Sequence, residues 1–433
     1  MQVYTFIRKA LRCFISGKFF FLGLAAGFMA CDYHDDESIV KTAREVYVSR
    51  LTETEINIRD YVPEDAVTAW MGSTFWTPKG TEAAYRWARN MGSDYLQLDV
   101  QQTREVRDEN GQLIEPSVLV VYSKEDLSLS SNIEYVFPSR AQEPLSSFSW
   151  SELNRLDLGT PFNYASPQRS RTGFEGLGIS TLEDVVMIAE GFRIVRTANK
   201  DRKQSIVLRN GELQWDFFYE QDPADNGNRP GLFIHPAAAD TSLLKKISLE
   251  LERLGWNIDR DPKDIPTQPG KVQVANTKGR VFLHASGRKM LAPLEFYFGG
   301  FPKSFSENTP LENSRDAPFA FADQLNFAVN NYAQFIFWDI SLGLLEPWQA
   351  DLVHRTGMRL HVGRVNHEET FKQVTGYYFR ERLSQMFPAS WELADGVLTD
   401  LPDLSLLLYA SLYNQPTRRP SVDAVEILDE LGY

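Results

Sequence analysis

The strongest constraint on the fold is a pattern that repeats between residues 66 and 413. Short apolar segments, typical of buried β-strands, alternate with longer segments whose apolar residues recur at helical spacing. This alternation predicts a parallel sheet covered by helices. We expect eight strands, at 66–71, 95–100, 118–122, 231–234, 281–285, 335–340, 358–365 and 396–399. Eight parallel strands in this order predict an α/β fold, the (β/α)8 barrel.

Some segments depart from this alternation. Residues 193–218 contain an Asn-Gly pair between two apolar runs, which predicts an inserted β-hairpin. Residues 257–272 and 301–318 are rich in Pro and Asp and are expected to form long loops at the rim of the barrel. Residues 294–298 are a ninth strand candidate. The sequence leaves open whether they replace the strand at 335–340.

The first 30 residues have the composition of a secretory signal. Four basic residues precede a charge-free apolar run at 19–30, which is too short to span a hydrocarbon core of ~30 Å. Cys31 directly follows Ala30, which resembles the lipobox of bacterial lipoproteins, where this cysteine is lipidated. An uncleaved signal anchor or ordinary cleavage nearby is the alternative. We therefore expect a protein of the bacterial cell envelope, anchored through Cys31 and facing the periplasm or the exterior. Inner and outer membrane both stay open.

The composition divides the chain into four parts. We expect a lipoprotein-type signal peptide at 1–30, a polar tether and lead-in at 31–62, the barrel at 63–415 and a C-terminal tail at 416–433. Loss of the signal would change the net charge from −13 to −17, because that segment has four basic residues and no acid. Such an acidic surface argues against nucleic acid as a partner and against electrostatic adhesion to anionic lipid.

Two segments at opposite ends of the barrel resemble the glycerophosphodiester phosphodiesterase family. Residues 92–100, GSDYLQLDV, are similar to the family's G-A-D-x-I-E-L-D-V strand, which carries metal-binding carboxylates. Residues 394–404, ADGVLTDLPDL, resemble the V-D-G-I-I-T-D-x-P-D-L strand and turn that close the family's barrel. Weaker similarities follow in order at 148–153, 179–185, 230–234 and 360–366. The resemblance covers nearly all of the chain after residue 66 and implies a TIM barrel.

The sequence departs from the family where the resemblance places the active site. Trp70 and Met71 stand in the places of the first catalytic histidine and the phosphate-binding arginine. Lys79 replaces a carboxylate that holds a ligand. Gln97 replaces one of two metal-binding carboxylates, and Asp99 keeps the other.

Two further positions follow from the resemblance. The segment ending at Tyr122 replaces the motif of the second catalytic histidine, and His235 falls where a glutamate of the family binds metal. Asp99 and His235 are weak candidates for a metal site, and Lys79 and Arg364 are candidates for binding an anionic ligand. Trp70 and Tyr122 either pack the barrel core or form a stacking platform for a sugar or choline. Four more histidines do not cluster at metal-ligand spacing and are interpreted as ordinary surface or core residues: His284, His354, His361 and His367.

These departures bear on function, because the family's reaction uses a divalent cation on oxygen ligands and acid–base groups that titrate near neutral pH. We therefore expect a pseudoenzyme, a binding or scaffolding protein of the envelope that needs no cofactor and takes a phosphodiester or another small anion. The alternative is a divergent active phosphodiesterase that hydrolyses glycerophosphodiesters, with a divalent metal and a rearranged site of Asp99, His235, Lys79 and Arg364. The identity of the ligand, the protein partners and the oligomeric state do not follow from the sequence.

Changing Cys31 to Ser is expected to release the protein from membranes or to leave an unprocessed precursor, because acylation of this sulfur is the expected anchor. Membrane fractionation and metabolic labelling with a palmitate analogue measure this. Cys13→Ser is the matched control and should be labelled like the wild type, because Cys13 lies in the segment that is expected to be removed. Wild-type protein that takes up no label would contradict the lipid anchor.

Overall fold

The barrel expected from the sequence is present in the computed structural model. The structure describes residues 37–123, 127–196, 206–209, 212–215, 217–257, 278–307, 314–380, 385–386, 393–413 and 423–433. The expected signal peptide and Cys31 lie outside these residues, and so does nearly all of the expected loop at 257–272.

Eight parallel strands form a closed (β/α)8 barrel. In order around the barrel they are β1 (Ala66–Ala69), β2 (Tyr95–Gln102), β11 (Gly231–Pro236), β12 (Val281–Ser286), β13 (Lys303–Ser306), β14 (Phe335–Asp339), β15 (Arg359–Gly363) and β16 (Gly396–Thr399). β1 pairs in parallel with both β16 and β2, which closes the sheet. The predicted fold class is therefore confirmed.

One of the eight predicted barrel strands was wrong, and one barrel strand was not predicted. Residues 118–122 do not form a barrel strand, because β5 (Leu119–Val121) turns back and pairs antiparallel with the end of β2. The missing strand is β13, which lies within the predicted rim loop at 301–318. Its sequence, Lys-Ser-Phe-Ser, has a single apolar residue, so it gave no strand signal. The ninth candidate at 294–298 lies in a helix, which leaves 335–340 as the barrel strand.

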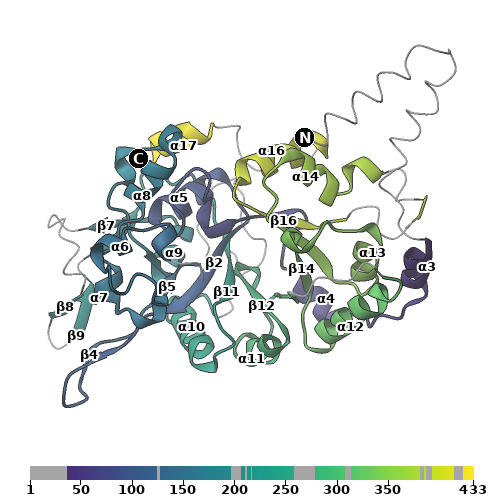
Figure 1. Ribbon diagram of the computed structural model, residues 1–433, viewed down its shortest axis with the longest axis horizontal. Coiled ribbons are helices and arrows are strands. Elements are labelled where there is room, and N and C mark those ends of the chain that lie inside the picture. The colour runs from purple at the N-terminus through teal and green to yellow at the C-terminus, as the bar shows by residue number, and fades with distance from the viewer. Residues whose placement is uncertain are drawn as a thin grey trace, which may run out of the picture.

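One main helix follows or precedes each barrel strand on the outside of the sheet. These are α5 (Glu82–Met91), α9 (Leu182–Ala189), α10 (Thr241–Arg253), α11 (Arg288–Phe298), α12 (Ala317–Asn330), α13 (Pro347–Arg355), α14 (Glu368–Val374) and α16 (Pro402–Leu412). Figure 1 shows the strands in the centre, with α10 and α11 below them and α14 and α16 above. Local signals set the helix ends. Thr181 and Asp184, for example, form a reciprocal capping box at the start of α9.

Aromatic side chains fill the barrel near the amino ends of the strands. Tyr95, Phe233, Phe282 and Phe335 are almost completely buried and belong to one apolar cluster. Phe282 lies between the others, with its ring centroid 4.6 Å from Phe335, 4.7 Å from Phe233 and 5.8 Å from Tyr95. Val62, which follows α4 (Glu53–Arg59), joins the same cluster. This end of the barrel is a packed core, so a ligand site of the barrel itself is expected at the carboxyl ends of the strands.

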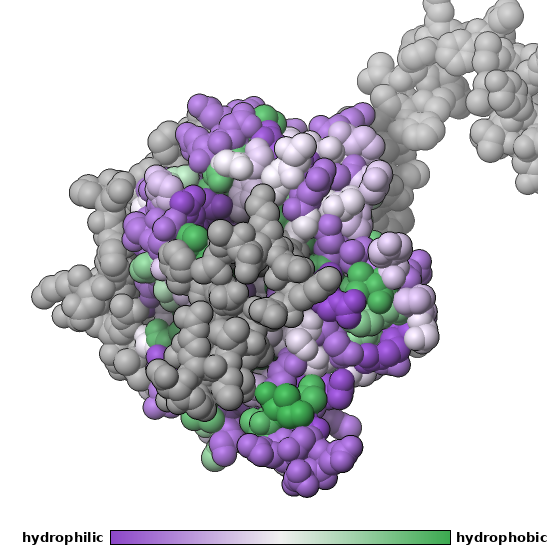
Figure 2. Space-filling model, turned by 90° about the vertical axis from the view of Figure 1, so that its left-hand side faces the viewer, coloured by the Kyte–Doolittle hydropathy of each residue, from purple (hydrophilic) through white to green (hydrophobic). Residues whose placement is uncertain are grey.

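A large insertion separates β2 from β11, so the connection between these two neighbouring barrel strands contains many elements besides a single helix. It contains β3 (Val106–Arg107), β4 (Leu113–Glu115), β5, α6 (Ile133–Val136), α7 (Trp150–Leu153), α8 (Gly159–Ala165), β6 (Ser180–Thr181), α9, β7 (Phe192–Arg196), β8 (Ile206–Arg209), β9 (Glu212–Trp215) and β10 (Phe217–Gln221). β8 and β9 pair antiparallel, which confirms the predicted inserted hairpin. The insertion has an apolar cluster of its own. On the coloured part of the face shown in Figure 2, most of the surface is hydrophilic, with separate hydrophobic patches.

Segments from both ends of the described chain pack on the barrel. α3 (Glu37–Glu45) contacts α12 and α13. α17 (Ala424–Glu430) packs on α5, where the Trp87 indole donates a hydrogen bond to the Ala424 carbonyl at 2.9 Å. In the part of the chain that the structure describes, none of the helices is both long and apolar enough to cross a membrane.

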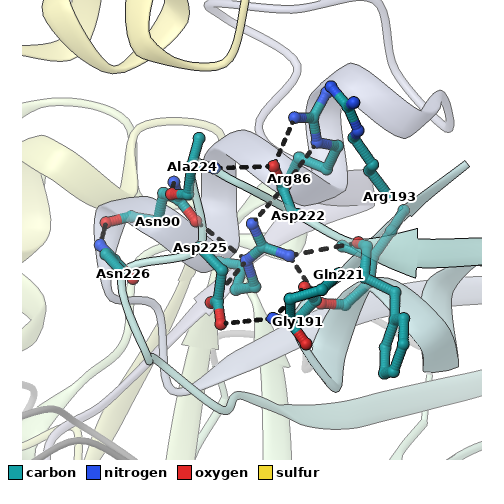
Figure 3. A network of polar contacts seen from close by, with 12 residues as sticks. Arg86, Asn90, Gly191, Arg193, Gln221, Asp222, Ala224, Asp225 and Asn226 are labelled. Atoms are coloured by element: carbon teal, nitrogen blue, oxygen red, sulfur yellow. Dashed lines mark hydrogen bonds and ion pairs between the residues drawn. The ribbon is translucent and has the colours of Figure 1, made fainter.

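A buried ion network joins the insertion to α5. Arg86 binds both carboxylate oxygens of Asp222, at 2.8 and 2.9 Å, and Arg89 binds Oδ2 at 2.7 Å. The Asp222 and Arg89 side chains have no exposed surface. Asp225 forms a second bidentate pair with Arg229 nearby (Figure 3). Because each buried charge has a partner of opposite sign, the network holds the segment after β10 against the barrel.

Asp222→Asn is expected to lower the free energy of unfolding by about 3–5 kcal/mol, because it leaves buried guanidinium groups without their counter-charge. Glu143→Gln is the matched control. Arg140 is also an arginine, but the Glu143 side chain is 42% exposed and solvent screens the pair, so we expect a much smaller loss than for Asp222→Asn. Urea unfolding at neutral pH measures both losses. A loss below that of the control would show that the network is not what holds the insertion.

The same network predicts a dependence on pH. Burial by itself would raise the pKa of Asp222, but the hydrogen bonds and charges of Arg86 and Arg89 outweigh it and lower the pKa from 3.8 to about 2. A lowered pKa means that the carboxylate stabilises the fold above pH 3.8, and that this contribution disappears as the pH falls towards 2. This difference in pKa corresponds to about 2 kcal/mol of stability. The free energy of unfolding of the wild type should lose this contribution as the pH falls from 3.8 towards 2, and the Asp222→Asn variant should not show this loss.

Candidate functional site

The loop after β1 places Trp70 and Met71 at the carboxyl end of the barrel. Both belong to a short 3-10 helix, Trp70–Gly72. Met71 is completely buried and adopts a left-handed backbone conformation with φ +48°, which is uncommon outside glycine. Gly72 has φ +90°, and a Cβ there would lie 2.6 Å from the Ala84 carbonyl carbon. The loop is thus turned tightly against α5, and the Met71 side chain points into the core rather than to a ligand.

Asp99 is the centre of a buried polar cluster at the end of β2. Its Oδ1 accepts a hydrogen bond from Gln97 Nε2 at 2.8 Å and lies 3.0 Å from His235 Nδ1 on the neighbouring strand β11. The Gln97 amide oxygen accepts the Met71 N–H at 3.2 Å. The parallel register places His235 directly opposite Asp99. The structure therefore brings together the two residues that the sequence proposes as metal candidates, in direct contact with each other.

A second histidine adjoins this cluster. The rings of His235 and His284 lie 4.8 Å apart and nearly perpendicular. His284 Nδ1 is 2.7 Å from Ser304 Oγ, and its Nε2 is 3.1 Å from Ser306 Oγ. His284 is thus a core histidine with hydrogen-bond partners, as interpreted from the sequence, but its place beside His235 was missed. Both histidines end a run of three apolar residues in adjacent strands, LFIH and VFLH, and this shared pattern was the available signal.

Two cations lie around Trp70 on the other side of the barrel mouth. The Arg364 guanidinium carbon lies 3.8 Å from the Trp70 ring centroid, and Lys79 Nζ lies 5.9 Å from it. Lys79 also donates to Ser123 Oγ at 3.5 Å. Arg364 follows β15 and lies 3.8 Å from the Asp400 carboxylate, while 44% of its side chain stays exposed. An indole next to two cations favours an anionic group at this position.

Tyr122 does not line the mouth as a barrel-strand residue. It follows the antiparallel strand β5, and its ring is completely buried in the apolar cluster of the insertion. Its hydroxyl is hydrogen-bonded to Ser130. The Tyr122 ring still borders the site from outside, because Lys79 Nζ lies 5.6 Å from its centroid. Of the two roles considered for Tyr122, packing is the one that this position fits.

The other histidines that the structure describes lie away from the mouth. His361 is buried inside the barrel against Phe282 and Phe335, and burial lowers its pKa to about 4. His354 pairs with Asp395 at 2.8 Å. His367 is exposed before α14. These placements agree with their interpretation as ordinary core and surface residues.

Comparisons with known proteins support the resemblance seen in the sequence. No protein-family model matches the chain. The chain is 25% identical over 118 residues to a glycerophosphodiester phosphodiesterase of Bacillus subtilis (strain 168), and 28% identical over 112 residues to a glycerophosphoinositol inositolphosphodiesterase of Mus musculus. The match to the Bacillus subtilis protein covers 27% of this chain and 34% of that protein. The match to the Mus musculus protein covers 26% of this chain and 19% of that protein. The chain therefore aligns with about a third and a fifth of the lengths of these relatives.

The fold comparison covers far more of the chain. A crystal structure from Silicibacter pomeroyi DSS-3, named as a glycerophosphoryl diester phosphodiesterase, superposes with a TM-score of 0.50 at 13% identity. It covers 83% of this chain and 97% of that chain. The sequence is similar to glycerophosphodiester phosphodiesterases over about a quarter of the chain, and the fold is the TIM barrel of the compared structure. The shared fold places a candidate site at the mouth of the barrel, whereas the chemistry depends on the residues present there.

The residues at the mouth do not fit the divalent cation that the family implies. Within the described ranges, no three His, Cys, Asp or Glu side chains come together as a metal site. Oδ1 of Asp99 already takes hydrogen bonds from Gln97 and His235, and Asp400 is held by Thr74 and Asn366. Mg²⁺ and Ca²⁺ need several oxygen ligands with enough negative charge. One carboxylate engaged by two neighbouring donors does not provide them.

Gln97→Glu tests this reading, because it restores a second carboxylate beside Asp99. We expect the variant to lose about 1–3 kcal/mol of stability in a chelator, since two buried like charges then face each other. Millimolar Ca²⁺ should restore part of the loss, whereas the wild type should not respond. Thermal unfolding with and without Ca²⁺ measures both effects. Gln112→Glu makes the same change on the exposed β3–β4 turn and is the control. A wild type that responds to Ca²⁺ as strongly as Gln97→Glu would contradict the reading.

Proposed function

We propose that this chain is a pseudoenzyme of its family, a membrane-anchored envelope lipoprotein whose barrel mouth binds a small anion, such as a phosphodiester, without hydrolysing it. The observation that supports this most is the environment of Trp70. Where the family has a catalytic histidine, the chain has an indole with the Arg364 guanidinium 3.8 Å from its ring centroid. An indole cannot exchange a proton near neutral pH, whereas the guanidinium and the nearby Lys79 attract an anion.

The rest of the mouth supports binding over hydrolysis. Tyr122, near the place of the second histidine, is buried, and its hydroxyl is bonded to Ser130. The carboxylate of Asp99 is engaged by Gln97 and His235. Each acid–base group is worth about 10²–10⁴-fold in rate, so losing both histidines removes most of the family's rate enhancement. The envelope location rests on the sequence around Cys31, and no nucleic acid or protein partner is part of the proposal.

A specific contact favours the alternative, a divergent active phosphodiesterase. Asp99 lies 3.0 Å from His235 Nδ1 and so orients the imidazole ring. The opposite nitrogen, Nε2, is buried and has no hydrogen-bond partner among the described residues. A histidine oriented by a carboxylate is the arrangement of a general base. If hydrolysis occurs, His235 is the residue that this geometry assigns to proton transfer.

One assay separates the two proposals. The full chain is incubated with glycerophosphocholine and with a chromogenic phosphodiester, with Mg²⁺, Ca²⁺ and Zn²⁺ in turn. We expect turnover equal to buffer, because the acid–base groups and most of the metal-binding charge are missing. Metal-dependent hydrolysis that Asp99→Ala or His235→Ala abolishes, and that His367→Ala leaves unchanged, would refute the pseudoenzyme and establish the alternative.

Binding is measured on the same samples by calorimetry with glycerophosphocholine. We expect Arg364→Gln and Lys79→Gln each to weaken binding by about tenfold, the value of one charge-assisted hydrogen bond. Lys41→Gln removes an exposed lysine from α3, a helix that packs on the outside of α12 and α13, and is the matched control. Equal affinity in all of these variants would show that the cations at the mouth do not bind the ligand.

A further inference from the structure

A second pocket lies outside the barrel mouth, between the insertion and the C-terminal helix. It has a volume of about 440 Å³ and is bordered by residues 168–172 of the insertion, by Trp76 and by residues of and after α17. Pockets that hold small molecules typically measure ~300–1,000 Å³. α8, which precedes the 168–172 segment, and α17 lie side by side at the top of the molecule in Figure 1. None of the residues proposed for the mouth lines this pocket.

Its lining combines an apolar wall with arginine side chains. Trp76, Val425, Leu428 and Tyr433 supply aromatic and aliphatic surface. The Trp76 indole is held in place by a hydrogen bond to Asp403 at 3.2 Å, and its ring lies 6.5 Å from that of Trp87. An apolar wall with a few placed polar groups is the usual composition of a small-molecule site.

The two arginines of this pocket differ in how their charge is compensated. Arg171 pairs with Asp429 at 2.5 Å and also donates to the Tyr433 carbonyl at 2.8 Å. Arg169 donates only to neutral oxygens, those of the Phe75 carbonyl and the Ser166 hydroxyl. Among the described residues no carboxylate pairs with it. Arg171 is thus a structural residue that fastens α17, and Arg169 is a cation without a counter-charge.

Arg169 is also held in a fixed position and partly desolvated. Its guanidinium lies 4.0 Å from the Phe75 ring centroid and 5.7 Å from that of Phe162. Burial lowers its pKa below the ordinary value, with no opposing contribution from an acid. A guanidinium presents five N–H donors in a rigid fork, which matches the two oxygens of a carboxylate or a phosphate. Ordering it in advance reduces the entropy lost when a ligand binds.

From these observations we infer that the pocket between residues 168–172 and α17 is a second binding site, specific for a small organic anion. The ligand carries a carboxylate or phosphate that binds Arg169 and an apolar ring or chain that lies against Trp76, Val425 and Leu428. The inference does not depend on the proposed function of the mouth, because the two sites share no residue.

Calorimetric titration of the full chain tests the site with three probes: 1-naphthoate, 1-naphthyl phosphate and the neutral 1-naphthalenemethanol. We expect at least one anion to bind about tenfold or more tightly than the alcohol, because a charge-assisted hydrogen bond is worth that difference. The anion that binds more tightly identifies the headgroup. If neither anion binds more tightly than the alcohol, the inference is overturned.

Variants assign the binding to the pocket. Arg169→Gln should weaken binding of the anion about tenfold and leave the alcohol unaffected. Val425→Glu should weaken binding of both probes, and of the anion more strongly, because it replaces part of the apolar wall with a negative charge. Arg155→Gln is the matched control, since Arg155 also stacks on a phenyl ring, 4.9 Å from Phe137, but does not line the pocket. Unchanged affinity in Arg169→Gln, or affinity lost in Lys79→Gln and Arg364→Gln instead, would overturn the second site.

Discussion

The closure of the barrel at β1 is the interaction on which the rest of the structure depends. Ala66–Ala69 pair with Gly396–Thr399 on one side, and Thr68 and Ala69 pair with Tyr95 and Leu96 on the other. This joins segments about 330 residues apart in the chain and fixes the register of the whole ring. The fit is tight, since a Cβ on Gly396 would lie 2.7 Å from His361 Nε2. Only with the ring closed do Trp70, Asp99 and Arg364 belong to one mouth.

Within that frame the mouth has two chemically different sides. On the β2, β11, β12 and β13 side, Asp99, His235, His284 and two serines form a row of hydrogen-bonded polar groups. On the β1 and β15 side, Lys79 and Arg364 surround an indole. The first side holds one carboxylate whose Oδ1 is already engaged, and the second presents positive charge. This division is the basis of our proposal that the mouth holds an anion rather than supporting metal-assisted hydrolysis.

The insertion between β2 and β11 depends on buried charge as much as on apolar packing. Its own cluster includes Tyr122 and Phe148, but its return to the barrel is secured by Asp222 against Arg86 and Arg89. The same region carries Arg169, whose charge is not compensated by a described carboxylate. Arginines of α5 that pair with the insertion therefore fasten the fold, while an arginine of the insertion that pairs with no described carboxylate borders a pocket. Burial with or without a counter-charge distinguishes the two roles.

The sequence by itself determined the fold class and seven of the eight barrel strands, because apolar periodicity is a local property. It predicted Asp99 and His235 together through their places at strand ends. Only the tertiary structure decided that Tyr122 leaves the barrel and that β13 enters it, since strand direction depends on which neighbour completes the backbone hydrogen bonds. The contact of His284 with His235, and the absence of a described carboxylate beside Arg169, were likewise decided by the tertiary structure, because contacts between distant side chains produce no periodic pattern in the sequence.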